Sequence, residues 1–571
     1  MYYFRIFFLL TFLSIFTFTA KCQIDLNKLF SEKGEVYFKF LNSQISSPKT
    51  ITRIISIDNL SQDNWIYAYA NRSEYERFLE LNIVHELLPH PGDLINPKMV
   101  DQINLKEINN WDYYPTYDAY VDIMNQFEEN YPDLCEVFSI GTSIEGRQLM
   151  FAKISNNVNT EEGEARVLYT SSMHGDETTG YVLMLHLIDY LLANYNSVDK
   201  VTNMVDNLEI WINPLANPDG TYAGGNNTVQ GATRFNANNI DLNRNYPDPD
   251  PYWGDHPDGN AWQKETIEFM ELADSISFVL SANFHGGAEV FNYPWDTWEH
   301  LTADDNWWQY VGHEWADTAQ FYSPEGYMDG YNDGITNGYQ WYFVHGGRQD
   351  HMNYFHNCRE VTLEISNTKL LPASQFPDFW EYNYRSFLNY LEQALFGIQG
   401  TVTDSISGEP VGALVFINDH DLDNSWVVSN TESGNYFRPL YQGVYDISFS
   451  AAGYQSKTIS QVNVSNKQLT ILDVELVYTG SGVQDIKTSG LFQIGPNPNN
   501  GRFYLTYLKQ ENIHCEIELF NVAGTLIKQL HHNFSAGSEV LTVDLNKEVS
   551  GIYLINIHTD RFTLQEKIII R

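Results

Sequence analysis

The chain has 571 residues and a formal net charge of −40, from 33 basic and 73 acidic residues. This charge argues against nucleic acid or an anionic membrane as a partner, and it modestly favours cationic substrates. Hydrophobic residues make up 43% of the chain and aromatic residues 15%, so large cores can be buried, and the length predicts about three or four domains.

The first residues have the pattern of a secretory signal. Arg5 is followed by the apolar run 6–18, which is too short to span a membrane, and no later stretch predicts a transmembrane segment. We therefore expect residues 1–22 to be a signal peptide. Lipid attachment at Cys22 is an alternative, which the preceding Lys21 disfavours.

The few cysteines exclude a disulfide scaffold. After the expected signal peptide only Cys135, Cys358 and Cys515 remain. Because an exported chain meets an oxidising environment, a disulfide between Cys135 and Cys358 is possible, and the sequence leaves it open.

Residues 23–105 are expected to form a small α+β domain. Short β-like runs alternate with a helical stretch near 73–79, and the polar, proline-bearing segment 89–97 is typical of a linker. The expected strands are 35–40, 51–57 and 65–70. The position of this domain, between a signal and a candidate enzyme, suits a propeptide that covers the active site; a permanent accessory domain is the alternative.

Residues 112–396 alternate between helical and strand patterns. A helix is expected at 117–129, strands at 147–154, 167–170 and 208–213, and a last helix at 380–395. This alternation predicts an α/β fold with a mixed, mostly parallel central sheet flanked by helices.

The remaining chain is predicted to be all β. Residues 397–477 contain short strands separated by turn residues, which indicates a β-sandwich, and a linker at 478–490 leads to a second all-β unit at 491–571.

A loop between a buried strand and a helix carries the first candidate metal ligands. The apolar run 165–171 precedes Ser172–Thr179, and His174 and Glu177 lie three positions apart in this loop. An imidazole and a carboxylate can share one metal ion, and a third protein ligand would leave the fourth zinc position for water. The best third donor is His285, because both histidines would then lie at the carboxyl ends of strands, where ligands gather.

Two further segments supply polar and charged groups. Residues 233–247 hold Arg234, Asn243 and Arg244, whose donors can grip a carboxylate or a developing oxyanion. On a later predicted strand, Glu364 lies on the face opposite the apolar one. A carboxylate in a central sheet is costly to bury unless it is used, for example as a general base; a solvated strand face is the alternative.

At these residues the chain resembles the zinc metallocarboxypeptidases, specifically the branch that contains carboxypeptidases E, N and D. The resemblance covers about residues 112–395 and involves five separated motifs in the family's order. It implies that His174, Glu177 and His285 hold one zinc ion, and that Asp241 orients a zinc ligand from outside.

The resemblance also implies roles in peptide hydrolysis. Glu364 falls on the general base and later proton donor, and Arg234 on the arginine that polarises the scissile carbonyl. The clamp for the free terminal carboxylate of the substrate would consist of Asn243, Arg244 and Tyr354.

The resemblance also implies a preference for certain C-terminal side chains of the substrate. Asp296 falls on the acid at the base of the side-chain pocket in this branch, and Gln349 also fits, so C-terminal Lys or Arg residues are expected. Arg348 and His351 depart from the pattern of the branch. If Arg348 turned toward Asp296 it would neutralise the acid, and broad or apolar specificity would follow.

The two β units have resemblances of their own. Residues 397–477 resemble the transthyretin-like domain that follows the catalytic domain in this branch. Residues 491–571 resemble the C-terminal sorting domain of the Bacteroidetes type nine secretion system, through the segments Gly495–Gly501, Phe520–Gly524, Ser550–Tyr553 and Lys567–Arg571. This implies passage through the periplasm and contact with the secretion machinery.

We therefore expect a zinc-dependent carboxypeptidase that is secreted or attached to the outer cell surface and acts on peptide or protein C-termini. Two alternatives stay open. The chain could be a catalytically silent peptide-binding surface module, or a zinc amidase that acts on cell-wall peptides.

Overall fold

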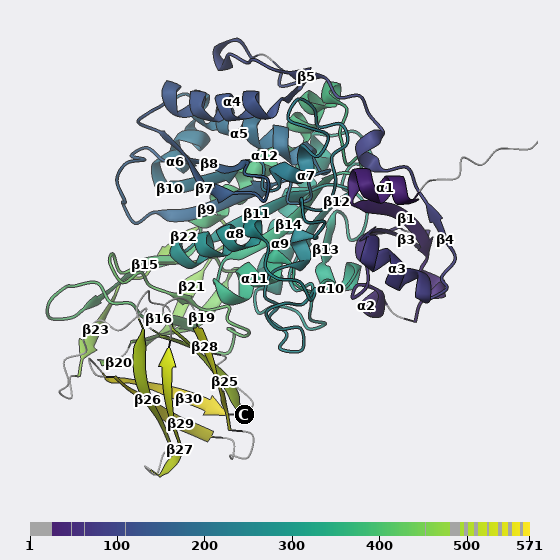
Figure 1. The fold of residues 1–571 in the computed structure, drawn as a ribbon. Helices are drawn as coiled ribbons and strands as arrows, with labels where there is room; N and C mark the ends of the chain where they lie inside the picture. The colour runs from purple at the N-terminus through teal and green to yellow at the C-terminus, as the bar shows by residue number, and fades with distance from the viewer. Residues whose placement is uncertain are drawn as a thin grey trace, which may run out of the picture. The chain divides into compact units, whose positions relative to one another are not determined.

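The computed structural model describes residues 26–479, except 47, 62, 109 and 452, and residues 492–570, except 496–500, 508–511, 522–524, 535–538, 546–550 and 560–562. The expected signal peptide, nearly all of the expected linker 478–490, and parts of the sorting segments lie outside the described residues. The chain divides into two units, Met1–Tyr478 and Thr479–Arg571 (Figure 1).

An eight-stranded mixed sheet forms the centre of the first unit, with the strand order β13-β12-β14-β11-β9-β10-β8-β7. Strands β9, β10, β11 and β14 run parallel to one another, whereas β7, β8 and β12 pair antiparallel with their neighbours, except where β12 meets β13. This is the mixed α/β sheet that the alternation predicted. The strands are Cys135–Thr142 (β7), Gln148–Ile154 (β8), Ala165–Ser171 (β9), Leu208–Asn213 (β10), Leu280–His285 (β11), Ala288–Tyr293 (β12), Ile335–Asn337 (β13) and Arg359–Ser366 (β14).

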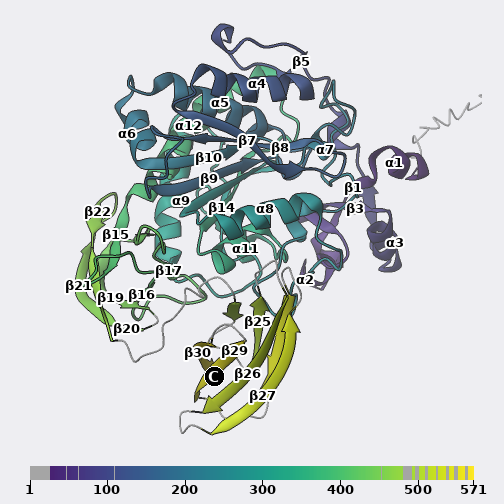
Figure 2. The ribbon, with the colours of Figure 1, turned by 60° about the vertical axis from the view of Figure 1, so that its left-hand side comes forward.

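Helices cover both faces of this sheet (Figure 2). Successive side chains of a strand point to opposite faces, so Val167 and Tyr169 of β9 pack in one apolar core and Leu168 packs in another. The first core includes α4, α5, α6, α9 and α12, and the second includes α8 and α11. The helices are Tyr117–Asn130 (α4), Thr179–Asn194 (α5), Asp199–Asn207 (α6), Pro218–Thr221 (α7), Lys264–Ser275 (α8), Asp305–Phe321 (α9), Gly338–Trp341 (α10), Arg348–Phe355 (α11) and Phe376–Glu392 (α12).

The parallel strands bring their carboxyl ends to one edge of the sheet. Strand β9 ends at Ser171, just before the loop with His174, and β11 ends at His285. On the neighbouring strand β14, Glu364 is the register partner of His285. The topology therefore gathers three chemistry-bearing side chains at a single edge.

The N-terminal residues form an antiparallel sheet of order β2-β3-β1-β4, with α1 and α3 beside it (Figure 1). The strand expected at 51–57 begins only at Ser56, because Ile51 and Ile55 lie one helical turn apart, both are buried, and the Ile55 amide donates to the Ile51 carbonyl. The elements are Leu26–Lys33 (α1), Glu35–Leu41 (β1), Pro48–Ile51 (α2), Ser56–Leu60 (β2), Trp65–Asn71 (β3), Arg72–Glu80 (α3) and His85–Leu87 (β4).

The expected linker 89–97 is not a free connection. His90, Pro91 and Gly92 are buried, and His90 Nε2 lies 2.8 Å from Glu35 Oε1. A Cβ atom at Gly92 would lie 2.1 Å from the backbone oxygen of Ala232, so this segment packs closely on the sheet-bearing domain. The short pair β5 (Met99–Val100) and β6 (Tyr114–Pro115) follows it.

Residues 397–477 form two sheets, of order β18-β15-β23-β20, where β22 also pairs with β15, and β17-β16-β19-β21. They enclose one apolar core that includes Ile398, Val415 and Phe449. The strands are Gly397–Asp404 (β15), Leu414–Ile417 (β16), Val427–Val428 (β17), Asn435–Arg438 (β18), Gly443–Ser450 (β19), Tyr454–Gln455 (β20), Lys457–Val464 (β21), Leu469–Ile471 (β22) and Val474–Tyr478 (β23).

The second unit is also built of β strands. Its sheets have the orders β24-β25-β28 and β27-β26-β29-β30, around a core that includes Phe503, Ile517 and Ile555. The strands are Phe492–Gly495 (β24), Arg502–Tyr507 (β25), Ile513–Asn521 (β26), Leu526–Phe534 (β27), Glu539–Asp544 (β28), Gly551–Thr559 (β29) and Thr563–Ile570 (β30).

The disulfide between Cys135 and Cys358 that the sequence left open does not form. Cys135 and Cys358 are buried and free. Cys135 begins the edge strand β7, whereas Cys358 precedes β14, and four strands lie between these two in the sheet. Adjacent strands are about 4.8 Å apart, so the separation far exceeds the roughly 7 Å between Cα atoms that a disulfide tolerates.

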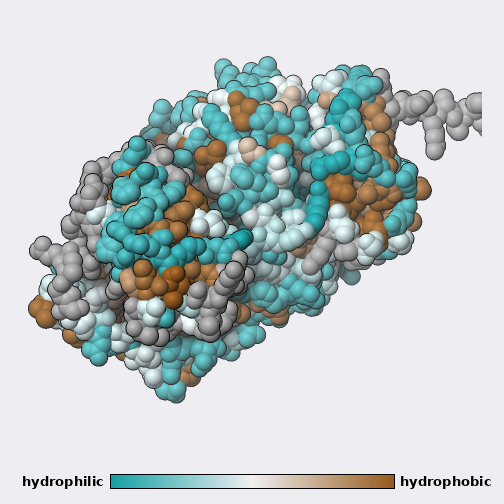
Figure 3. All heavy atoms as spheres, turned by 60° about the horizontal axis from the view of Figure 1, so that its bottom comes forward, coloured by the Kyte–Doolittle hydropathy of each residue, from teal (hydrophilic) through white to brown (hydrophobic). Residues whose placement is uncertain are grey.

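The surface carries hydrophobic residues in small groups among hydrophilic ones, on the face drawn in Figure 3. Large exposed hydrophobic side chains such as Val84, Phe321 and Ile406 are spread along the sequence, as is normal for a protein exterior. None of the helices within the described ranges is long and apolar enough to cross a membrane.

Candidate functional site

The loop between β9 and α5 holds two of the predicted ligands, His174 and Glu177, and both side chains are buried. The loop is tied to itself, because the Ser172 hydroxyl donates to the backbone oxygen of Glu177 over 2.8 Å. Gly175 packs against α7, and a Cβ atom there would lie 2.3 Å from the carbonyl carbon of Gly220. Only glycine fits this contact, and the resulting path of the loop fixes where the two ligands point.

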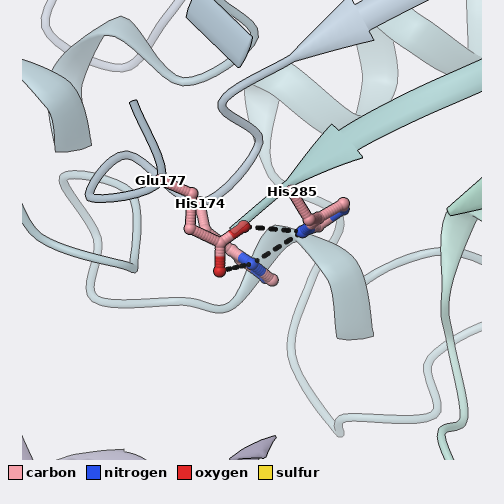
Figure 4. Close-up of side chains that lie close together, drawn as sticks. All are labelled: His174, Glu177 and His285. Carbon is pink, nitrogen blue, oxygen red and sulfur yellow. Dashed lines mark hydrogen bonds and ion pairs between the residues drawn. The ribbon is translucent and has the colours of Figure 1, made fainter. Parts of the chain in front are cut away.

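The three predicted ligands meet at one point (Figure 4). His174 Nδ1 lies 2.9 Å from Glu177 Oε1, and His285 Nδ1 lies 2.8 Å from Glu177 Oε2. The two Nδ1 atoms are 3.1 Å apart, and one donor atom from each residue lies within 4.8 Å of the others. Two imidazole nitrogens and a carboxylate that converge in a buried place are a donor set that suits zinc.

Outer contacts determine which nitrogen of each imidazole faces Glu177. His174 Nε2 lies 3.0 Å from Asp241 Oδ1, and His285 Nε2 lies 2.8 Å from the side-chain amide of Asn283. When a carboxylate accepts a proton from Nε2, the Nδ1 lone pair stays free for a metal ion. Asp241 therefore lies on the outer side of His174.

Glu364 lies beside this cluster. Its side chain is buried, so the alternative of a solvated strand face is wrong, and its Oε2 atom has no hydrogen-bond partner among the described residues. Burial raises the pKa of the Glu364 carboxyl well above its usual range, and the nearby Glu177 carboxylate raises it further. A carboxyl group with a raised pKa and an unpaired oxygen can exchange a proton with a neighbouring reactant.

Arg244 and Asn243 line the same cavity as the ligands His174 and His285, but Tyr354 does not. Arg244 Nη1 donates to the Asn243 backbone oxygen over 2.7 Å, and its Nε has no partner among the residues that the structure describes. The Tyr354 ring packs 5.5 Å from the ring of Trp298 instead. Tyr342 lines the cavity in its place.

Asp296 lies in the same cavity and is buried. Its Oδ1 accepts hydrogen bonds from Asn292 Nδ2 over 3.2 Å and from Gln349 Nε2 over 3.1 Å, and burial raises its pKa to about 6. Arg348 does not turn toward it, because Arg348 Nε donates to Glu360 over 2.9 Å. The acid is therefore not neutralised by Arg348.

Two consecutive residues of the N-terminal domain reach into this site. The Asp58 carboxylate pairs with Arg234 Nη1 at 3.2 Å, and the Ile57 backbone oxygen accepts a hydrogen bond from Arg244 Nη2 over 3.1 Å. The Tyr342 hydroxyl donates to the Asp58 backbone oxygen over 3.4 Å. Three side chains of the cavity are thus bonded to the strand β2.

Lys369 also contacts Asp58, which lines this cavity. Its ammonium group pairs with Asp58 Oδ1 and with Glu177 Oε1, the latter at 2.7 Å. With Asp58 in place, the cavity has a volume of about 20 Å³, which is room for about one water molecule and not for an amino-acid side chain.

The sequence prediction missed Tyr342, Asp58 and Lys369. Tyr342 stands in the same glycine-rich stretch as Tyr354, and the irregular spacing at His351 was the only signal in the sequence that the match there was shifted. Asp58 and Lys369 carry no motif of their own, because their contact depends on how two domains pack.

Comparison with known proteins gives a consistent result. Residues 120–386 match the family model described as zinc carboxypeptidase, residues 397–477 match the carboxypeptidase regulatory-like domain, and residues 493–571 match the secretion system C-terminal sorting domain. The last match indicates export to the cell surface or the medium.

Individual relatives are similar over long stretches. The carboxypeptidase N catalytic chain of Rattus norvegicus is 33% identical over 406 residues, which cover 65% of this chain and 87% of that protein. The same protein of Homo sapiens is 34% identical over 401 residues, 63% of this chain and 85% of that one. Carboxypeptidase D of Drosophila melanogaster is 33% identical over 443 residues, which cover 74% of this chain but 30% of that protein. The chain spans between 25% and 32% of the length of such carboxypeptidase D relatives.

Proposed function

Because the chain belongs to the zinc carboxypeptidase family, we propose that it is an exported enzyme that removes C-terminal Lys or Arg residues from peptides and proteins. One observation carries the proposal: His174 and His285, which both contact Glu177, line a single cavity together with Arg234, Arg244 and the acid Asp296. A site for a metal ion, for a terminal carboxylate and for a basic side chain would then be contiguous.

His174, Glu177 and His285 would hold one zinc ion, which when bound supplies a Lewis acid that activates water and polarises a carbonyl. Arg244, with Asn243 and with Tyr342 in place of Tyr354, would grip the terminal carboxylate of the substrate. The requirement for this carboxylate would restrict cleavage to the last peptide bond.

Glu364 would move the proton. It takes the proton of the attacking water as the oxygen adds to the scissile carbonyl carbon, and the carbonyl electron pair moves to the oxygen, where Arg234 stabilises the charge. When this pair returns and the C–N bond breaks, Glu364 gives the proton to the leaving amine. Asp241 would keep His174 and Arg234 in position, since it contacts both.

Asp296 would select basic side chains at the base of the pocket. Kinetics on two peptides that differ only in a final Arg or Phe test this, and we expect kcat/KM to favour Arg by more than about tenfold, which corresponds to roughly 1.4 kcal/mol. Asp296→Asn should remove the preference. Equal turnover of both peptides by Asp58→Ala, which keeps Asp296, would refute the specificity and leave the peptidase assignment intact.

We also propose that residues 23–105 act as a propeptide-like cover. The support is that Ile57 and Asp58 occupy the hydrogen-bonding groups of Arg244 and Arg234, so a peptide cannot enter until β2 moves. Asp58→Ala in the full chain should raise hydrolysis of an Arg-ending peptide by about tenfold or more, because a buried charge pair is lost. Asp93→Ala is the control, since Asp93 pairs with Lys33 at the surface of this domain. If both variants behave alike, the domain is a permanent accessory.

The two alternative functions, a silent binding module and a zinc amidase, explain fewer features of the site. A silent binding module would not need the orphaned Oε2 atom of Glu364 next to three metal-suited donors. A zinc amidase for cell-wall peptides shares the site chemistry, and it would be favoured if a peptide with an amidated C-terminus were cleaved as well as its free acid.

A further inference from the structure

Lys369 is fixed next to the metal-suited cluster by the backbone. It follows β14, and its backbone oxygen accepts a hydrogen bond from the amide of Thr178 over 3.0 Å, one residue after Glu177. The side chain is 7% exposed. Its end passes over Gly287, where a Cβ atom would lie 2.9 Å from Lys369 Nζ, so this glycine gives the ammonium group its room.

Two cations share two oxygens at this place. Glu177 Oε1 lies 2.7 Å from Lys369 Nζ and 3.4 Å from Arg234 Nη1. Asp58 Oδ1 contacts the same two groups, Lys369 Nζ and Arg234 Nη1, the second at 3.2 Å. One oxygen thus belongs to the catalytic domain, and the other is supplied by the N-terminal domain.

The position of Asp58 Oδ1 favours negative charge. When β2 leaves, Lys369 and Arg234 each lose one partner and keep Glu177 Oε1, and an excess of buried positive charge is costly. The terminal carboxylate of a substrate has its own place, because Arg244 is bonded to the Ile57 backbone oxygen and not to Asp58 Oδ1. The substrate atom that gains charge beside Glu177 and Arg234 is the oxygen of the scissile carbonyl.

Resting on the proposed function, we infer that Lys369 is a further catalytic residue, which binds the oxyanion of the scissile carbonyl together with Arg234. Asp58 Oδ1 occupies the position of that oxyanion in the covered form. The charge on the oxygen appears when water adds to the carbonyl carbon, and it disappears when the C–N bond breaks, so Lys369 stabilises the transition state more than the bound substrate.

The test compares Asp58→Ala with the double variant Asp58→Ala/Lys369→Met, so that the effect of Lys369 on the docking of Asp58 is absent from both. We expect kcat to fall by roughly 10²-fold, the loss found when one oxyanion donor is removed, with KM within about threefold. In the Asp58→Ala background, Lys369→Arg should keep most of the kcat that Lys369→Met loses. Lys153→Met is the control, because the ammonium group of Lys153 pairs with Glu136 on β7.

Two readouts that do not depend on turnover separate this role from others. The zinc content of the double variant should equal that of Asp58→Ala. A phosphonate peptide, whose tetrahedral P–O⁻ group imitates the oxyanion, should bind more weakly by the same factor that kcat/KM falls, and a product amino acid should bind equally well.

The possible results are distinguishable. Loss of zinc would make Lys369 a positioning residue for Glu177 and overturn the inference, as would an unchanged kcat. A raised KM with unchanged kcat would make it a ground-state carboxylate binder and also overturn it. If zinc-loaded Asp58→Ala itself releases no C-terminal residue, the proposed function fails before the role of Lys369 is reached.

Discussion

Two buried carboxyl groups of the site differ in their immediate neighbours. Asp296 accepts hydrogen bonds from Asn292 and Gln349, whereas Oε2 of Glu364 accepts none from the described residues. Hydrogen bonds hold Asp296 in one orientation, which suits a group that only attracts charge. The unpaired oxygen of Glu364 suits a group that must gain and lose a proton.

The raised pKa of Asp296, about 6, predicts a pH-dependent specificity. Below pH 6 the carboxyl is protonated and neutral, and above it the carboxylate attracts a guanidinium group. The ratio of kcat/KM for Arg-ending over Phe-ending peptides should therefore rise between about pH 5 and pH 7 and then level off. Steady-state kinetics on Asp58→Ala measure it; a ratio that stays flat, or falls, would remove Asp296 from the pocket base.

Glu364→Gln keeps the shape of the side chain and removes its proton exchange. Turnover should fall by at least about 10²-fold, the lower range for a general base, while zinc stays bound in the same amount. Metal analysis and peptide hydrolysis on the same preparation measure both quantities. Retained turnover would exclude Glu364 from proton transfer.

Single residues of the site could be predicted from the sequence where a metal-ligating residue type follows the carboxyl end of a predicted strand. His174, Glu177 and His285 could be predicted, because each follows an apolar run whose carboxyl end faces the site. Tyr342 could not be separated from Tyr354, since both lie in one aromatic stretch and only the course of the backbone into α11 decides which ring enters the cavity.

The position of each site residue depends on the element that carries it. The loop between β9 and α5, which carries His174 and Glu177, is the most tightly packed of these elements. It lies against α7 with no space for a side chain at Gly175. The helix α5 begins directly after the loop, and the strand β9 ends directly before it. A shift of the loop would therefore move His174 and Glu177 together.

Gly175→Ala should strain this contact. A Cβ atom 2.3 Å from backbone atoms forces the loop or α7 to move, and such overpacking typically costs about 1–3 kcal/mol. Gly286→Ala is a matched control, because its Cβ atom would meet nothing closer than 3.6 Å. Thermal unfolding and zinc affinity of both variants test this, and equal values would show that the loop tolerates a side chain.

Helices and strands with a regular spacing of apolar residues could be predicted from the sequence. Segments whose apolar spacing fits both a helical turn and a strand could not. The helix expected at 117–129 is α4, Tyr117–Asn130, because Thr116 caps it and its apolar residues keep helical spacing. Of the strand expected at 51–57 only the part from Ser56 is β, because the same isoleucines can satisfy a helical turn or a strand, and packing against β1 and β3 decided between them.

In the first unit, charged groups join the β-sandwich 397–477 to the sheet-bearing domain. Arg438 is fully buried and pairs with Asp304 at 2.9 Å and with Asp421 at 2.6 Å. Asp304 also pairs with Arg359, which begins β14, at 2.9 Å. The sandwich is thereby tied to the strand that carries Glu364.

Arg438→Met should leave Asp304 and Asp421 buried without this cation. Breaking a buried ion pair from one side costs about 3–5 kcal/mol, so the free energy of unfolding should fall by several kcal/mol. Lys98→Met, which breaks the exposed pair with Asp112, should cost less than about 1 kcal/mol. Urea unfolding of both variants measures the difference; similar losses would mean that the interdomain pair is unimportant.

The order of domains was evident from changes in pattern along the chain, but their contacts were not. Asp58 gave no signal in the sequence, since an acid on a short strand is ordinary until another domain supplies Arg234 and Lys369 around it. The packing of residues 89–97 was also hidden, because proline and glycine are common both in free linkers and in close contacts.

The central claim is that two histidines, one glutamate and an arginine clamp form one zinc-dependent site for peptide C-termini. Its most direct test is to add zinc stepwise to metal-free Asp58→Ala and to follow an Arg-ending peptide and its C-terminal amide by mass spectrometry. We predict release of the last residue alone from the free acid, rising with zinc until about one equivalent is bound and then constant, and no cleavage of the amide. Cleavage that is independent of zinc, or equal cleavage of the amide, would contradict the account.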